Sequence, residues 1–268
     1  IHITGKEVSS GAIGNTPYRE GVFNTFNDPA KFGLFYHAAL MYIRGDVKEA
    51  KKSVSIKVDS HDAHPFTVPA LSEETAEMHK VGMVFDEKDL TGAIEIKEND
   101  SFCRDNKGEV YSDTGELYRS WEKGMGWINT ERTKALYGFC SGEVEIELGC
   151  VRIDVRSDFA VIALSSLTHK GIGQADNILM TAIGRSENTN MTFSESHEQL
   201  LDIGEAPVLA EAVEAKIRIR TAVEGVRVLS VNAEGFYTGE IPSAYHNGWL
   251  EFETGKRYKS MYYLIQAE

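Results

Sequence analysis

The sequence predicts a mainly β protein: an antiparallel β-sandwich region that is preceded by one amphipathic helix. Short segments rich in β-branched and aromatic residues recur from about residue 110 to the end of the chain. Turn residues separate these segments at short intervals, and only residues 28–44 have a pronounced helical periodicity. No strand–helix alternation follows that helix, so we do not expect an α/β fold. The 268 residues suffice for one large domain or two modest ones.

The predicted helix has clear start and stop signals. Asp28 can cap the free N–H groups of the first turn, and Pro29 suits the first helical position. Gly45 follows Arg44, so a stop residue and a favourable cation lie at the C-terminal end. We expect one continuous helix whose apolar face docks on a larger body. The side chains of that face are Phe32, Phe35, Tyr36, Ala39, Leu40 and Ile43.

After the helix, Val54, Ile56 and Val58 alternate with polar residues, which predicts a half-buried strand. Residues 72–80 predict a short helix. Further strands are predicted over residues 144–148, 151–155, 159–164, 178–183, 216–220, 226–231, 249–252 and 258–265. The turns that punctuate them are predicted at residues 113–115, 141–142, 233–235, 247–248 and 254–255.

The charge balance excludes two classes of partner. The formal net charge is -13, from 41 acidic and 28 basic residues, so the surface repels nucleic acid and acidic membranes. No apolar run approaches the ~20 residues of a membrane-spanning helix. The chain begins Ile1-His2-Ile3 rather than with Met, and we expect further sequence upstream. Localisation stays open, because any signal peptide would lie on that side.

Three segments resemble the C-terminal portion of clan A glycoside hydrolases, which are (β/α)8-barrel enzymes of β-galactosidase-like and cellulase-like type. Residues 15–24 (NTPYREGVFN), continuing through residues 27–32 to Arg44-Gly45-Asp46-Val47, look like the last barrel loop, the eighth helix and an "RGDV" exit. Residues 127–135 (WINTERTKA), followed by Gly138-Phe139, are similar to a "DTPRTQA..GF" signature of an accessory β-domain. Here Asn129 and Glu131 replace the expected Asp and Pro. Residues 179–189 (LMTAIGRSENT) resemble the "LTAVGRAENTG" strand and turn of that domain, with Asn190 in place of Gly.

The resemblance implies a domain organisation. Residues 1–52 would be the remnant of a catalytic barrel, and residues 53–268 the accessory β-sandwich region. The two catalytic Glu residues of such enzymes, which lie ~5 Å apart when the mechanism is retaining, would precede Ile1, so no catalytic residue is assigned in this chain. The implied partners are the upstream barrel of the same polypeptide and an oligo- or polysaccharide.

Some side chains are candidates for carbohydrate contact. His2, Asn15, Tyr18 and Arg19 would lie in the loop at the active-site face of the barrel. The alternative is a loop held together by its own hydrogen bonds. Flat aromatic rings can carry the C–H face of a sugar, and the alternative for such rings in strands is core packing. The platform candidates are Trp121, Trp127 and Trp249, and Tyr245 is a further candidate.

Metal and cofactor signals are weak. His61 and His64 lie in a polar segment, residues 59–64, but lack a third ligand at a defined spacing. A second group of oxygen-bearing side chains could hold calcium, although no EF-hand pattern is present; its members are Asp86, Glu87, Asp89, Asp100, Asp105 and Asn106. In both places a solvated loop is the alternative, and we expect no metal and no cofactor. Cys140 and Cys150 could pair across neighbouring strands or stay as thiols.

Three functions remain in consideration. The first is the C-terminal part of a glycoside hydrolase, inactive by itself, whose accessory β-domain supports the barrel. The second is a self-contained carbohydrate-binding module, and the third is a structural β-domain without a ligand. An exposed apolar helix face would favour the first over the other two, because such a face requires a partner.

Overall fold

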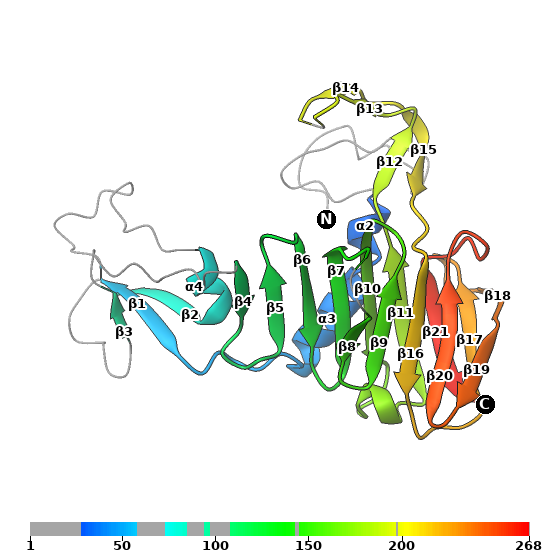
Figure 1. Ribbon diagram of the computed structural model, residues 1–268, viewed down its shortest axis with the longest axis horizontal. Helices are drawn as coiled ribbons and strands as arrows, with labels where there is room; N and C mark the ends of the chain where they lie inside the picture. Colours follow the sequence, from blue (N-terminus) through cyan, green and yellow to red (C-terminus); the bar gives the residue numbers. More distant parts are fainter. Residues whose placement is uncertain are drawn as a thin grey trace.

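The computed structural model describes residues 28–57, 73–84, 94–96, 108–142, 145–196 and 198–267. Over these residues the protein is mainly β, and its two largest sheets are antiparallel throughout (Figure 1). The predicted fold class is confirmed at that level. No helix within the described residues is long and apolar enough to cross a membrane.

The largest sheet has nine strands within the described residues, and its central strands are covered on both faces. Their order across the sheet is β18-β17-β21-β11-β10-β7-β6-β5-β4. In that order the strands span Tyr237–Ile241, Val226–Val231, Tyr262–Ala267, Asn177–Ile183, Phe159–Ser166, Thr133–Phe139, Met125–Asn129, Leu117–Ser120 and Glu109–Tyr111.

A second antiparallel sheet, of five described strands, lies in front of the first in Figure 1. Its order is β19-β20-β16-β9-β8, with strands Ser243–His246, Trp249–Thr254, Ala215–Arg220, Val151–Val155 and Ile146–Leu148. Along β9 the buried residues Val151, Ile153 and Val155 alternate with half-buried polar ones. These side chains join Leu164 and Met180 of the larger sheet in one hydrophobic cluster, so both sheets share a core.

The predicted strands and turns agree closely with this part of the structure. β9 and β17 coincide with their predicted ranges. Asn247 and Gly248, with φ of 52° and 80°, form the tight turn between β19 and β20. The last predicted strand begins late, at Tyr262, because Lys259 takes a left-handed conformation (φ 47°) and ends any extended run before it. No disulfide joins Cys140 to Cys150.

The segment after the helix contradicts the expectation of purely antiparallel pairing. β1 (Ser53–Lys57) pairs in parallel with both β2 (Lys80–Val84) and β3 (Ile94–Ile96), in the order β2-β1-β3. The helix α4 (Glu73–Met78) lies between β1 and β2 in the chain, close to the predicted range of 72–80. Parallel neighbours need a crossover connection, and α4 is part of that connection. Strand–helix alternation therefore does occur here.

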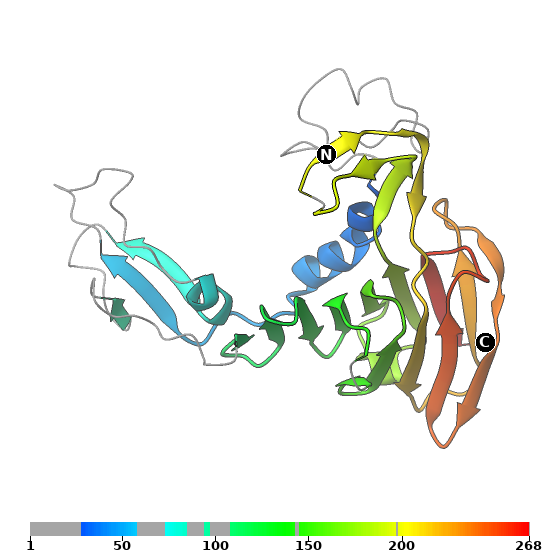
Figure 2. The ribbon, with the colours of Figure 1, turned by 45° about the horizontal axis from the view of Figure 1, so that its top comes forward.

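Two narrow ribbons extend beyond the shared core (Figures 1 and 2). β12 (Ser186–Thr189) pairs with β15 (Glu205–Ala210), and β13 (Thr192–Phe193) pairs with β14 (Leu200–Asp202). A short 3-10 turn, η2 (Ile172–Gln174), precedes β11.

The predicted N-terminal helix is broken into two, α2 (Pro29–Phe32) and α3 (Phe35–Arg44). Its ends are as predicted: the Asp28 carboxylate accepts a hydrogen bond from the Ala30 N–H, and Gly45 is a left-handed C-cap. The break follows Gly33, whose carbonyl oxygen accepts a hydrogen bond of 3.1 Å from the Thr181 hydroxyl. A Cβ on Gly33 would lie 3.4 Å from the Thr181 methyl group and 2.9 Å from the Pro29 carbonyl oxygen. Glycine thus lets the helix approach the sheet at this point.

The shared core can be tested by truncating one of its side chains. Ile217 of β16 is fully buried between the sheets, whereas Ile43 of α3 is 80% exposed. We expect Ile217→Ala to lower the free energy of unfolding by about 2–5 kcal/mol, because it leaves a cavity. Ile43→Ala, the matched control, should change it by less than about 0.5 kcal/mol. Urea titrations of both variants measure the difference, and equal losses would contradict the assigned core.

Candidate functional site

The apolar face of α2 and α3 points away from the sheet, contrary to the expectation that it docks there. Tyr42 is 89% exposed and Ile43 80%, and Phe32, Phe35, Tyr36 and Ala39 are exposed as well. Leu40 is half-buried. The exposed residues Phe32, Phe35, Tyr42 and Ile43 are called the outer helix face below. Tyr36 is exposed as well, but its ring meets Tyr262 of the nine-stranded sheet edge-on, with centroids 6.2 Å apart.

A polar side chain takes the place that the apolar face was expected to occupy. His37 is only 2% exposed and lies between α3 and the nine-stranded sheet. Its Nδ1 is 2.9 Å from the Ser165 hydroxyl, and its Nε2 is 2.9 Å from the Thr181 hydroxyl. Burial, with a smaller effect of the nearby Arg44 charge, lowers the pKa of His37 to about 4. The imidazole is therefore neutral at physiological pH.

A buried carboxylate fixes the C-terminal end of α3. The Asp46 side chain is almost inaccessible and forms ion pairs with Arg44 (2.5 Å) and Arg132 (2.9 Å). The Thr133 hydroxyl donates a further hydrogen bond of 3.0 Å to Asp46. Arg44 also donates to the carbonyl oxygen of Ser166, and Arg132 donates to that of Arg44. Because these contacts are directional, they set the rotation of the helix on the sheet.

Residues from three separate segments of the chain hold the helix on the sheet. Arg44 and Asp46 come from the first segment, and Arg132 and Thr133 come from the second. The third segment supplies Thr181 and also Ser186, whose hydroxyl donates a 2.6 Å hydrogen bond to the Asp28 carboxylate. These three segments thus fasten the helix to the sheet.

The small parallel sheet is tied to the large one through the turn between β4 and β5. The Asp113 carboxylate accepts 2.9 Å hydrogen bonds from the N–H groups of Lys51 and Lys52 and lies 3.0 Å from His79. The Lys51 hydrogen bond is the main reason that the pKa of Asp113 falls to about 2. A second tie is the ion pair of 3.0 Å between Glu77 of α4 and Arg119 of β5.

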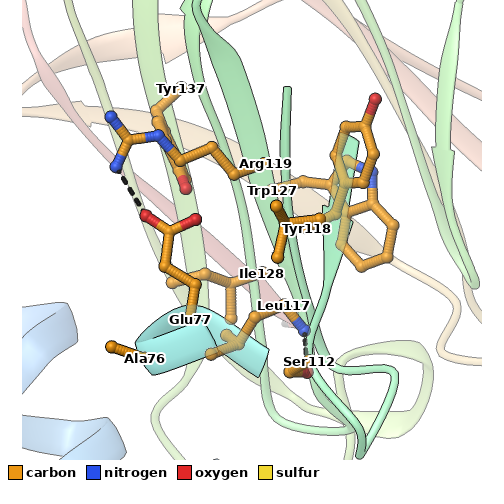
Figure 3. Close-up of a pocket in the computed structure, with 10 residues that line it drawn as sticks. Ala76, Glu77, Ser112, Leu117, Tyr118, Arg119, Trp127, Ile128 and Tyr137 are labelled. Atoms are coloured by element: carbon orange, nitrogen blue, oxygen red, sulfur yellow. Dashed lines mark hydrogen bonds and ion pairs between the residues drawn. The ribbon is translucent and has the colours of Figure 1, made fainter. Parts of the chain in front are cut away.

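A cavity of about 290 Å³ lies at this junction (Figure 3). Cross-strand pairing places Val110, Arg119, Gly126 and Tyr137 in one row across β4, β5, β6 and β7, on the face toward α4. A Cβ at position 126 would lie 2.3 Å from the Tyr137 hydroxyl, so glycine makes room for that ring. The lining residues are Ala76, Glu77, Val110, Ser112, Leu117, Tyr118, Arg119, Trp127, Ile128 and Tyr137.

The neighbouring cross-strand row has its rings on the opposite face. Tyr118 and Trp127 are directly paired, and their rings stack with centroids 5.3 Å apart. Figure 3 shows both rings turned away from Glu77, Arg119 and Tyr137. Sequence reasoning did not identify these last three residues, because their types are common and they come from three separate elements. The one usable signal was the predicted helix over 72–80, which carries Glu77.

The three tryptophans proposed as sugar platforms do not lie together. Trp121 follows β5 and has the Arg119 guanidinium 3.7 Å from its ring centroid, and Trp249 of β20 has Arg152 at 4.5 Å. Trp127 is stacked on Tyr118, so each of the three indoles already has a neighbour on one ring face. The hydroxyl of Tyr245 donates to the Thr221 carbonyl oxygen at 3.0 Å.

Other predicted site residues lie outside the described residues. They are His2, Asn15, Tyr18 and Arg19, the histidines His61 and His64, and the acidic candidates between Asp86 and Asn106. In the described parts of the chain, no group of three or more His, Cys, Asp or Glu side chains is arranged to hold a metal ion.

Comparisons with known proteins do not identify a family. No protein-family model matches the chain, and neither a curated protein nor a solved structure is significantly similar to it.

The buried histidine predicts a pH dependence of stability. Between its usual pKa of 6.5 and the lowered value of about 4, the unfolded chain binds a proton that the folded chain does not. The free energy of unfolding is therefore unaffected by His37 above pH 6.5. It falls by about 3 kcal/mol as the pH is lowered to about 4, because protonation of His37 favours the unfolded chain. Urea titrations from pH 7 to pH 4 measure this loss. His37→Gln should flatten the curve, whereas replacement of the exposed His169 by Gln should leave its slope unchanged; equal slopes for all three proteins would contradict the assignment.

Proposed function

We propose that this chain is the C-terminal part of a glycoside hydrolase, in which the outer helix face packs on a catalytic (β/α)8 barrel of the same polypeptide. Residues 1–52 would belong to the end of the barrel, and residues 53–268 would form an accessory β-sandwich region. The observation that carries the proposal is a helix that is fastened by its polar side and leaves its aromatic and aliphatic side chains in solvent.

The exposure of these apolar side chains is costly. Exposed apolar side chains gain free energy when another surface covers them, by roughly 25 cal/mol per Å² of apolar area. Phe32 and Phe35 form an aromatic pair, with centroids 5.2 Å apart, and Ile43 lies on the same outer face. The outer helices of a (β/α)8 barrel bury such a face against the barrel strands. In such an arrangement the helix would have two covered sides. Its polar side chains would form hydrogen bonds with the β region, and its apolar side chains would be buried against the barrel.

The β-sandwich assignment rests on the shared core. Two antiparallel sheets that contribute alternate side chains to one hydrophobic cluster are the arrangement expected of a sandwich. We infer that this sandwich is a rigid support for the barrel and one wall of its substrate cleft. The catalytic carboxylates would then belong to the barrel, and the chain by itself would not turn over a glycoside.

The outer helix face favours this function over the two alternatives. A self-contained carbohydrate-binding module or a structural β-domain without a partner would not require four exposed apolar side chains on the outer face of α2 and α3. For both alternatives, polar substitutions on the outer helix face would leave the thermal stability unchanged. The experiment below uses that difference.

We expect Tyr42→Asp combined with Ile43→Asp to uncouple the two parts of the complete gene product. Aspartate would leave a charge in a buried apolar contact, which costs several kcal/mol. By calorimetry, the wild-type protein should unfold in one main transition. The double variant should unfold in two transitions, the lower one shifted by several degrees.

The matched control is Phe236→Asp, which alters an aromatic residue that is also exposed but lies near the β17–β18 turn. This control should unfold like the wild type. Two findings would contradict the proposal: a double variant that unfolds like the control, or hydrolysis of aryl glycosides by the isolated chain that is lost when one of its Glu residues is replaced.

A further inference from the structure

The cavity between α4 and the nine-stranded sheet has the features of a small-molecule site that is separate from the outer helix face. We propose that it binds one uncharged sugar ring, with the Glu77–Arg119 pair holding neighbouring hydroxyl groups. All residues of this site lie within the described chain, so the inference does not depend on an attached barrel.

The first observation is an acceptor without a donor. One carboxylate oxygen of Glu77 lies 3.0 Å from the Arg119 guanidinium. The other, Oε2, is buried and has no hydrogen-bond partner in the described structure. A buried carboxylate oxygen that lacks a donor destabilises the protein, because it has lost its hydrogen bonds to water and has no protein hydrogen bond in their place. A ligand that donates a hydrogen bond to this oxygen removes that cost.

The second observation is the charge balance of the lining. Glu77 and Arg119 neutralise each other, and the guanidinium lies over the Trp121 ring, 3.7 Å from its centroid. Among the described residues, no further charged side chain lines the cavity. A charged ligand would enter without a counter-ion of its own and would lose its hydration at a large cost. The balance therefore favours an uncharged ligand.

The third observation is the combination of apolar walls with a few polar groups, among them the Glu77–Arg119 pair. Ala76, Val110, Leu117 and Ile128 provide apolar surface, and Arg119 adds a hydrogen-bond donor next to the Glu77 acceptor. A sugar ring presents C–H groups to apolar walls, and two adjacent hydroxyl groups match a donor and an acceptor that lie side by side. The volume of about 290 Å³ accommodates one such ring.

Saturation-transfer NMR on the full chain tests the proposal with a panel of single sugars. The probes are glucose, galactose and mannose, with glucuronate as the anionic and glucosamine as the cationic comparison. We expect at least one neutral sugar to bind, with glucuronate and glucosamine weaker. Glu77→Gln should weaken binding about tenfold or more, because it removes the charged acceptor and the ion pair.

The control for the charge change is Glu49→Gln, which breaks the exposed Glu49–Lys80 ion pair (2.6 Å) away from the cavity and should bind like the wild type. If Glu77→Gln is unfolded by circular dichroism, Ala76→Leu replaces it as the test, since it narrows the cavity and leaves the charges in place. Ala76→Leu should also abolish binding. Absence of binding by all three neutral sugars, preference for a charged sugar, or wild-type binding by the folded cavity variants would overturn the proposal.

Discussion

The ion pairs of the buried Asp46 carboxylate are the contact on which the arrangement of the N-terminal helix depends. An ionised carboxylate in a protein interior is tolerated only with charged or donor partners, and Arg44, Arg132 and Thr133 supply them. Removing one partner of such a pair typically costs 3–5 kcal/mol, so the group holds one geometry. Because its hydrogen bonds are directional, α3 cannot roll to bury its apolar side on the sheet.

His37 extends the same constraint along the helix. The face of the nine-stranded sheet below α3 carries the hydroxyl groups of Ser165 and Thr181, which match an imidazole. The opposite face of the same strands, with Leu164 and Met180, builds the hydrophobic core. One sheet thus has an apolar face for its partner sheet and polar groups for the helix, and the outer helix face stays exposed.

Local sequence signals predicted the ends of elements well and their orientation poorly. Asp28 and Gly45 act within one turn of the helix, so their roles follow from the sequence alone. Helical periodicity identifies an apolar stripe but not the surface that covers it, which is why the rotation of α3 was predicted wrongly. The break after Gly33 depends on Thr181, nearly 150 positions later in the chain, and no local pattern encodes it.

The cavity shows the same limit for function. Glu77, Arg119 and Tyr137 were not predicted because only the fold of α4 over β5 and β7 brings them together. Trp127 was predicted as a sugar platform, yet strand alternation turns its ring to the other face of the sheet, where it stacks on Tyr118. The parallel pairing of β1 with β2 was missed since it depends on a crossover connection of more than twenty residues.

The most direct test of the account is the solvent accessibility of Tyr42 in the complete gene product. Hydroxyl-radical footprinting followed by mass spectrometry measures the oxidation rate of this side chain, which is 89% exposed in the chain described here. The account predicts rapid oxidation in the isolated chain and strong protection in the complete gene product, while Phe236, which is 69% exposed, is oxidised at the same rate in both. Equal oxidation of Tyr42 in the two proteins would contradict the claim that a second domain covers the outer helix face.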